Sequence, residues 1–473
     1  MADVRIKDVL DVLDNSLEIQ QGAVRVSNPA KFREKVQKLA GISALESGEK
    51  QKLARYLTRA AALDLGIIPT SIHDLYMARG RGEVPPVFTV PAINLRALSF
   101  DAARVIFRVA KSMDAAAFIF EIARSEIGYT DQHPTEYATS ILAAAIAEGH
   151  KGPVFIQGDH FQISAKRYGA NPGTEVQAVK DLIRESLAAG FFNIDVDTST
   201  LVDLSKPSVP EQQALNTELS AELTAYIRTV EPKGITVSVG GEIGEVGGRN
   251  STEEELRAYI EGFRKALDKR GAGMTGLSKI SIQTGTSHGG VVLPDGSIAK
   301  VKVDFDTLQR LSQVARRDYA MGGAVQHGAS TLPEDAFGKF VETETCEIHL
   351  ATNFMNMFFD RIPDALREEM YAYLREKHSS DKKSDMTDEQ FYYKVRKNAV
   401  GPFKKQSWNA PPAVKEAVEK DWEAQFRKLF NLLGMKDTRQ YIEKFIKPVV
   451  IQPNLKDYLG EAAGVESVSD LAD

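Results

Sequence analysis

The sequence predicts a (β/α)8 barrel with helical extensions at both ends, and three observations lead to this prediction. Eight short runs rich in apolar and β-branched residues alternate with helical stretches through the middle of the chain. The runs recur about every 37 residues, a spacing that suits one strand, one helix and two loops. Near-continuous apolar strands separated by helices favour a parallel sheet buried on both faces, and eight such units can close into a barrel. An open doubly wound sheet is the alternative, but no GxGxxG motif follows the first run.

The elements follow in order along the chain. Residues 4–66 carry apolar side chains at intervals of three and four, which predicts a helical N-terminal section. From about residue 363 the pattern is helical again. We therefore expect an N-terminal extension over 1–84, a barrel over 85–360 and a C-terminal extension over 361–473. The eight expected strands are 87–95, 116–123, 153–160, 192–199, 236–244, 278–285, 320–328 and 346–352.

The amino-acid composition of the chain excludes several classes of function. Acidic residues number 65 and Lys plus Arg 59, so the net charge of −6 lacks the basic footprint of a general nucleic-acid-binding protein. The single cysteine, Cys346, excludes an intrachain disulfide and a thiolate metal cluster, and it indicates a reducing, cytoplasmic setting. No apolar run approaches the roughly 20 residues of a membrane span, and the first residues predict no signal peptide. We expect neither a nucleic-acid partner nor a membrane partner.

Four of the eight histidines lie at or just inside the ends of expected strands. Catalytic residues of such barrels lie at the carboxyl ends of strands, so these side chains should converge on one rim. One histidine there is more often a hydrogen-bonded core residue, whereas three imidazoles around an open fourth position form a typical catalytic zinc site. Asp159 and Glu242 lie beside them and could orient a ligand, bind the metal, act as a base or form a salt bridge. The four histidines are His160, His288, His327 and His349.

Two glycine-rich segments also follow expected strands. Residues 285–290 read GTSHGG and residues 326–330 read QHGAS. Their glycines allow backbone amides to approach a ligand closely, and the loops after the seventh and eighth strands of such barrels often bind phosphate. Each glycine alone is more simply explained as a turn residue. Together with Ser330 and Thr352, the segments predict a phosphate-binding site.

Six motifs lie at the ends of expected strands in a fixed order. They read GDH, DTS, GGEIGEVGG, GTSHGG, QHGAS and LAT, at the ends of the third to the eighth strands. In order and spacing, over roughly residues 85–360, this set resembles the class II, zinc-dependent fructose-bisphosphate aldolase family. The resemblance implies a barrel enzyme of glycolysis and gluconeogenesis. It would reversibly cleave a ketose bisphosphate, most simply fructose 1,6-bisphosphate, to dihydroxyacetone phosphate and an aldehyde.

The resemblance also implies roles for individual residues. The expected zinc ligands are His160, His288 and His327, with Glu242 and Asp197 as acidic groups at or near the metal. Asp159 would be the acid/base residue. The expected phosphate-binding residues are Gly289, Gly328, Ser330 and Thr352. A monovalent cation such as Na⁺ or K⁺ can accompany Zn²⁺, and family members are commonly dimers or tetramers.

The sequence departs from the family pattern at several positions, and these departures bear on the identity of the substrate more than on metal binding. His349 occupies the eighth strand where the family usually has an asparagine that touches the enediolate. An acid expected for proton transfer after GGEIGEVGG is missing, and Glu253 or Glu254 could supply it unless the proton moves another way. Ser125 lies just beyond the second strand, where the family has a serine at the strand end. The tyrosine and lysine common after the second zinc histidine are absent.

Three functions stay open from these patterns. The first is the fructose-bisphosphate aldolase, the second an aldolase for another phosphorylated ketose such as tagatose bisphosphate, and the third a sugar-phosphate-binding relative without turnover. A Schiff-base aldolase would need a lysine that points into the barrel from a strand end. We expect none, because Lys279 begins the sixth strand and Lys166 lies beyond the third motif. The added helices offer apolar faces for packing onto the barrel, which we prefer, or for assembly into a homo-oligomer.

Overall fold

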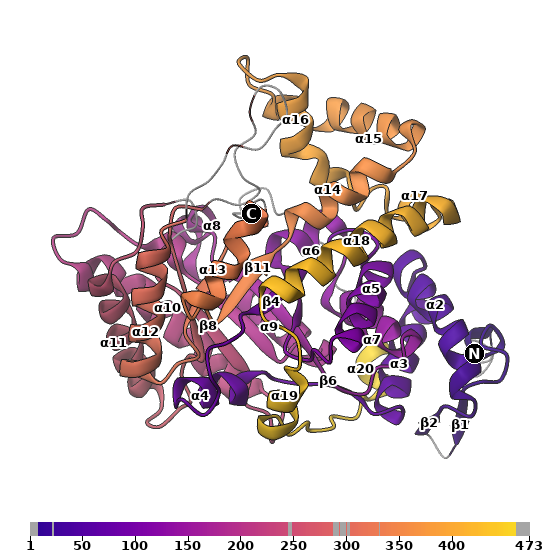
Figure 1. Ribbon diagram of the computed structural model, residues 1–473, viewed down its shortest axis with the longest axis horizontal. Coiled ribbons are helices and arrows are strands. Elements are labelled where there is room, and N and C mark those ends of the chain that lie inside the picture. Colours follow the sequence, from indigo (N-terminus) through magenta and orange to yellow (C-terminus); the bar gives the residue numbers. More distant parts are fainter. Residues whose placement is uncertain are drawn as a thin grey trace.

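A closed parallel barrel of eight strands, surrounded by helices, forms the centre of the protein (Figure 1). The computed structural model describes residues 8–20, 23–244, 248–286, 293, 299, 303–330 and 332–459. The barrel strands run in the order β6, β5, β4, β11, β10, β9, β8, β7, and β6 also pairs with β7, which closes the sheet. All eight expected strands are present, so the predicted (β/α)8 fold is confirmed. The strands are β4 (Val90–Asn94), β5 (Ile119–Ala123), β6 (Gly152–Gln162), β7 (Asn193–Asp197), β8 (Ser238–Glu242), β9 (Lys279–Ile282), β10 (Ala324–Gln326) and β11 (Glu347–Leu350).

Helices cover the outside of the barrel. The most buried is α7, which is apolar on nearly all sides and lies among α2, α3, α5 and α9. No helix in the described part of the chain is both long and apolar enough to cross a membrane. The main covering helices are α5 (Ser99–Ser112), α7 (Pro134–Ala147), α9 (Pro172–Ala189), α10 (Val209–Val230), α11 (Glu253–Arg270), α12 (Phe305–Tyr319), α13 (Phe337–Glu342) and α14 (Thr352–Arg361), with short α6 (Arg124–Thr130) and α8 (Ala165–Ala170) beside them.

The N-terminal section contains strands as well as the expected helices. An antiparallel hairpin of β1 (Glu18–Gln20) and β2 (Ala23–Arg25) lies just before α2. A third strand, β3 (Ile67–Pro69), pairs in parallel with the start of β6. Strands of three residues are too short to show a periodicity of their own, which explains why the pattern predicted helix alone. The helices of this section are α2 (Pro29–Leu45), α3 (Gly48–Asp64) and α4 (His73–Gly80).

The C-terminal section packs onto the barrel through α18 (Pro412–Leu432), which contacts α5 and α14. Trp422 of α18 is 1% exposed, and its indole N–H donates to the carbonyl of Phe354 at 3.1 Å. The ring of Phe426 also lies 4.6 Å from that of Phe354. The predicted domain boundaries at 84/85 and 360/361 stay a prediction. Two further helices of this section, α15 (Asp364–Lys377) and α16 (Asp388–Val395), project from the body of the protein (Figure 1). Its short helices are α17 (Lys404–Trp408), α19 (Arg439–Phe445) and α20 (Leu455–Leu459).

Replacing Trp422 by alanine tests this packing. We expect the free energy of unfolding to fall by about 3–5 kcal/mol, because the change removes a buried indole and leaves the Phe354 carbonyl without its donor. Lys420→Ala, at an exposed position of the same helix, should change it by less than about 0.5 kcal/mol. Urea unfolding followed by circular dichroism measures both. If both substitutions lowered the free energy of unfolding equally little, the C-terminal section would not share a core with the barrel.

Candidate metal centre and active site

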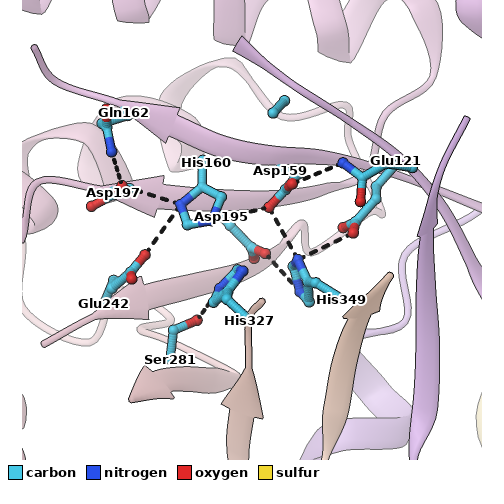
Figure 2. A network of polar contacts seen from close by, with 12 residues as sticks. Glu121, Asp159, His160, Gln162, Asp195, Asp197, Glu242, Ser281, His327 and His349 are labelled. Carbon is cyan, nitrogen blue, oxygen red and sulfur yellow. Dashed lines mark hydrogen bonds and ion pairs between the residues drawn. The ribbon is translucent and has the colours of Figure 1, made fainter. Parts of the chain in front are cut away.

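A cluster of buried ionisable side chains fills the barrel at the carboxyl ends of its strands (Figure 2). Each member is less than a tenth exposed. The strands that carry them belong to one closed parallel sheet whose carboxyl ends meet at one rim, which explains why residues far apart in sequence meet here. We call this group the upper cluster. Its members are Asp159 and His160 of β6, Asp197 of β7, Glu242 of β8, His327 just after β10 and His349 of β11.

Asp159 and His160 are consecutive residues of β6, yet both side chains face the upper cluster. Successive side chains of a regular strand point to opposite faces. Here the pairing of β6 with β7 shifts between Gly158 and Phe161, and His160 has a φ of 40°, in the left-handed region. Gly158 permits this bulge, because a Cβ atom there would lie 2.4 Å from the Phe161 ring. The bulge therefore places the predicted base and the predicted ligand side by side.

Two carboxylates hold the imidazole ring of His160. Its Nδ1 atom lies 3.2 Å from Asp197 Oδ2 and 3.3 Å from Glu242 Oε2. Asp197 is itself fixed by the Gln162 amide and the Ser199 hydroxyl, each donating at 2.7 Å. Carboxylates commonly orient metal-binding histidines in this way. The predicted positions of Asp197 and Glu242 near a metal site agree with this geometry.

Two overlapping sets of donor atoms in the upper cluster could hold a metal ion. One consists of His160, Glu242 and His327, and the other of Asp159, His327 and His349. In each set one donor atom per residue lies within 4.8 Å of the others. The His327 ring lies between its neighbours, with centroids 4.2 Å from His160 and 4.1 Å from His349. Imidazole nitrogens and carboxylate oxygens are ligands of tetrahedral Zn²⁺, so the residues present fit such an ion.

Burial and mutual charge shift the pKa values in the cluster. Burial raises the pKa of Glu242 to about 7, with Asp197 acting in the same direction and His160 opposing it. Burial also works to raise the pKa of Asp159, but His160 and His349 hold it well below its usual range. For His160, burial lowers the pKa, whereas Asp159 and Glu242 raise it well above the usual value. Asp159 therefore stays ionised, which is the form that a general base requires.

Two of the predicted phosphate-binding residues, Ser330 and Thr352, lie near the start of α14. The Ser330 hydroxyl accepts a hydrogen bond of 2.5 Å from the backbone N–H of Ala351, and Thr352 is the first residue of α14. Gly328 has a φ of 66°, which favours glycine. Arg96, which was not predicted, donates to the Thr352 hydroxyl at 3.3 Å. A helix N-terminus with a guanidinium beside it suits an anion.

Several predicted residues lie apart from the upper cluster. Ser125 is buried at the start of α6, and its hydroxyl has no hydrogen-bond partner among the described residues. Glu253 begins α11, is 41% exposed and pairs with Arg257 on the helix surface at 2.8 Å. The structure therefore does not bring Glu253 to the site, although it is close in sequence to the fifth strand. The predictions for His288 and Gly289 lie outside the described residues.

Asn94 belongs to the site but is not among the predicted residues. It ends β4, and its amide donates to Asp159 Oδ2 at 2.9 Å and to Glu126 Oε2 at 2.8 Å. Glu126 also forms a buried ion pair with Arg96 at 2.5 Å. Asn94 therefore fixes one oxygen of the predicted base. The rule that indicates the histidines, a polar side chain at a strand end, also indicates Asn94.

A second layer of buried polar side chains lies toward the amino ends of the strands. Because residues i and i+2 of a strand share a face, this layer is found by stepping back two residues from a known site position. That step leads from Asp159 to Gln157 and from His349 to Glu347. We call this group the lower layer. Its members are Glu121, Gln157, Asp195, Lys279 and Glu347, which come from β5, β6, β7, β9 and β11.

We expected no lysine that points into the barrel from a strand end, but one lysine, Lys279, does point into the barrel from the start of β9. Lys279 is fully buried, and its Nζ atom lies 2.8 Å from Gln157 Oε1, 2.9 Å from Asp195 Oδ1 and in contact with Glu347. It begins β9, as predicted, but alternation along the strand decides which way a side chain points. Burial works to lower the pKa of Lys279, yet Asp195 and Glu347 raise it above its usual value. The side chain is therefore an ammonium ion.

Gly158→Ala tests the role of the β6 bulge. The added methyl group would meet the Phe161 ring, so the strand must shift and displace His160. We expect the affinity for Zn²⁺ to fall at least about tenfold, as when the surroundings of a metal ligand are disturbed. Gly169→Ala on α8, where a Cβ atom has nothing within 4 Å, is the matched control. Zinc titration followed by elemental analysis measures both, and wild-type affinity in Gly158→Ala would contradict the role assigned to the bulge.

Comparison with known proteins gives the family. Among solved structures, the chain is similar to a fructose-bisphosphate aldolase from Campylobacter jejuni (17% identity, TM-score 0.46, covering 79% of this chain and 97% of that one). It is also similar to a "probable tagatose 6 phosphate kinase" from Sinorhizobium meliloti (17%, 0.51, 76% and 90%). A third is the fructuronate-tagaturonate epimerase UxaE from Cohnella laeviribosi (13%, 0.51, 82% and 86%). The last two likenesses support the fold alone. Residues 87–436, most of the chain, match the model of class II fructose-bisphosphate aldolase, so the protein belongs to that family.

Proposed function

We propose that the protein is a zinc-dependent aldolase that reversibly cleaves a phosphorylated ketose, with fructose 1,6-bisphosphate as the leading substrate. The observation that carries this proposal is the pair formed by Asp159 and His160 at the β6 bulge. Asp159 Oδ1 lies 3.8 Å from His160 Nε2. An ionised base and a metal ligand are thus adjacent, so a proton acceptor and a Lewis acid can act on neighbouring oxygens of one substrate.

The residues of the upper cluster divide the chemistry between them. His160, His327 and Glu242, with the predicted His288, would hold the metal. When bound, Zn²⁺ supplies a Lewis acid that polarises the substrate carbonyl and stabilises the negative charge on its oxygen. Asp159 removes the proton from the C4 hydroxyl, the C3–C4 bond breaks, and its electrons move toward the C2 carbonyl. In the direction of synthesis the same carboxyl group returns the proton.

The phosphate of the dihydroxyacetone phosphate half fits the group at the start of α14. The backbone N–H groups of the first turn and the hydroxyls of Ser330 and Thr352 offer hydrogen bonds, and the helix dipole favours an anion there. Gly328 and the predicted Gly289 would allow close approach of the backbone. Fixing the phosphate would hold the reacting carbons beside Asp159, and such positioning contributes to catalysis.

The carbon left by cleavage must receive a proton. We keep Glu253, with Glu254 as the alternative, as the proposed donor, because both follow the motif in which the family carries this acid. In the structure Glu253 faces Arg257, so the proposal requires that this ion pair open during turnover.

We also propose that the protein acts in the cytoplasm as a homo-oligomer, a dimer or a tetramer. A phosphorylated sugar is its proposed partner, and neither nucleic acid nor a membrane is one. A monovalent cation such as Na⁺ or K⁺ would accompany Zn²⁺. Light scattering after size-exclusion chromatography tests the assembly.

Another ketose is the second candidate, and His349 favours it. Where family members have an asparagine that touches the enediolate, this chain has an imidazole engaged with carboxylates. With a different side chain beside the substrate position, the protein could act on tagatose bisphosphate or another phosphorylated ketose. A sugar-phosphate-binding relative without turnover is the remaining alternative, although an ionised base beside the proposed metal ligands would serve no purpose in it.

Metal analysis and a coupled assay for triose phosphate test the proposal together. We expect about one zinc per chain and cleavage that a chelator abolishes and added Zn²⁺ restores. Asp159→Asn should lower kcat by about 10²–10⁴ with zinc content unchanged, because it removes the base but not the ligands. Lack of zinc and of chelator-sensitive cleavage of any ketose phosphate would contradict the proposal. Conversion to an epimeric ketose without triose phosphate would point to a different use of the site.

Borohydride trapping tests whether Lys279 takes part as a nucleophile. Its amine is held in the charged form between carboxylates, and only the neutral amine attacks a carbonyl. We expect no covalent label after incubation with fructose 1,6-bisphosphate and borohydride. Mass spectrometry of peptides that contain Lys279 provides the measurement, and a label there would establish Schiff-base chemistry instead.

A further inference from the structure

His349 connects the upper cluster to the lower layer. It lies on β11, is 4% exposed, and both of its ring nitrogens face carboxylates (Figure 2). Nδ1 lies 3.0 Å from Asp159 Oδ1 and 3.1 Å from Glu121 Oε1. Nε2 lies 2.7 Å from Glu347 Oε1. The ring is therefore engaged on both edges, although the resemblance suggested a residue that contacts substrate.

The geometry indicates how the ring is hydrogen-bonded. An ionised carboxylate only accepts hydrogen bonds, so a nitrogen that faces one must donate. Nδ1 therefore donates to Asp159, and Nε2 donates to Glu347. His349 thus links two carboxylates of opposite layers.

Glu347 is a rigid anchor for this link. Its Oε2 atom accepts a hydrogen bond from the Tyr76 hydroxyl of α4. Its Oε1 atom accepts from the Gln157 amide at 3.0 Å and contacts Lys279 Nζ. These donors come from three separate elements, and all of them are buried. A carboxylate held from so many directions cannot rotate, so it fixes the position of His349.

Asp159 is held at both of its oxygens. His349 lies at Oδ1, and the Asn94 amide donates to Oδ2 at 2.9 Å. A general base acts only when its oxygen lies within hydrogen-bond reach of the proton it removes. Displacing a reacting group by about 1 Å can cost about 100-fold in rate. Without His349, the hydrogen bond from Asn94 and the longer contact with His160, 3.8 Å from Oδ1, would be left to restrain the carboxylate.

We propose that His349 is a positioning residue: anchored on Glu347, it holds the carboxylate of Asp159 in the orientation required for proton removal. This inference rests on the proposed aldolase function and adds a residue that acts without touching the substrate. A different role is open to the same side chain, because Asp159, His327 and His349 could together bind a metal. The test separates the two roles.

The first measurement is the kinetics of His349→Leu and His349→Gln. We expect kcat for ketose cleavage to fall about 100-fold in His349→Leu while KM changes less than about twofold. His349→Gln should recover part of kcat, because its amide can still donate to Asp159. His150→Gln, in the connection between α7 and β6, is the control and should match the wild type. Zinc content should be unchanged in all variants, and its loss in both His349 variants would overturn the proposal in favour of a metal ligand.

The second measurement combines His349→Leu with Asp159→Asn. If His349 acts through the base, the double variant should be no slower than Asp159→Asn alone. A general structural role would instead lower the rate by a similar factor in both backgrounds. That additive result would overturn the proposal.

Crystal structures of the variants give a readout that does not depend on activity. We expect Asp159 to leave its wild-type rotamer in His349→Leu and to keep it in His150→Gln. If His349→Leu fails to fold, His349→Gln and Glu347→Gln replace it, the latter weakening the anchor at constant shape. An unchanged Asp159 in these variants overturns this inference alone, whereas absence of ketose cleavage by the wild type overturns the proposed function.

Discussion

The geometry of the site depends on one irregular backbone position, His160, where β6 departs from regular alternation. In a regular strand, Asp159 and His160 would face opposite sides, and a base and a metal ligand could not act on one substrate. A left-handed residue other than glycine costs of order 1–3 kcal/mol, so the surrounding structure must hold it in place. The Phe161 ring packed over Gly158 and the carboxylates around His160 provide that restraint. Each residue of the motif GDH thus has a structural reason: Gly158 leaves space for the Phe161 ring, and the bulge turns the proposed base Asp159 and the proposed metal ligand His160 to the same side.

The charge buried inside the barrel is the second constraint. Barrels of this kind are usually filled by branched apolar side chains, whereas two layers of ionisable groups occupy this one. Isolated buried charges are costly, and paired ones seldom add net stability, so such an interior indicates function rather than folding. The pairing is systematic: Lys279 lies between Asp195 and Glu347, and His349 between Asp159 and Glu347. Each cation orients carboxylates that would otherwise repel one another.

The barrel could be predicted from the sequence because strands buried on both faces are continuous apolar runs, and eight of them recur at one spacing. The strand-end rule likewise indicates Asp159 and His160. It does not predict that both face inward, because the bulge depends on tertiary packing. Asn94 and Lys279 were not predicted because weight was given to histidines and acids rather than to alternation along each strand. Glu253 lies near a site strand in sequence, but the structure pairs it with Arg257 on the surface of α11, so its role stays a proposal.

An inward lysine in an aldolase barrel raises the question of why this chain would need a metal. Burial alone would favour the neutral, nucleophilic amine, but Asp195 and Glu347 reverse the effect and raise the pKa of Lys279. The position of Lys279 also argues against a nucleophilic role. It lies two residues before Ser281 on β9, and it is the Ser281 hydroxyl that reaches the upper cluster, 2.9 Å from His327 Nε2. A substrate carbonyl beside the upper cluster would therefore be a full layer away from the ammonium group. Lys279 contacts carboxylates of the lower layer, and in the proposed function the carbonyl would be polarised by an ion held by the histidines.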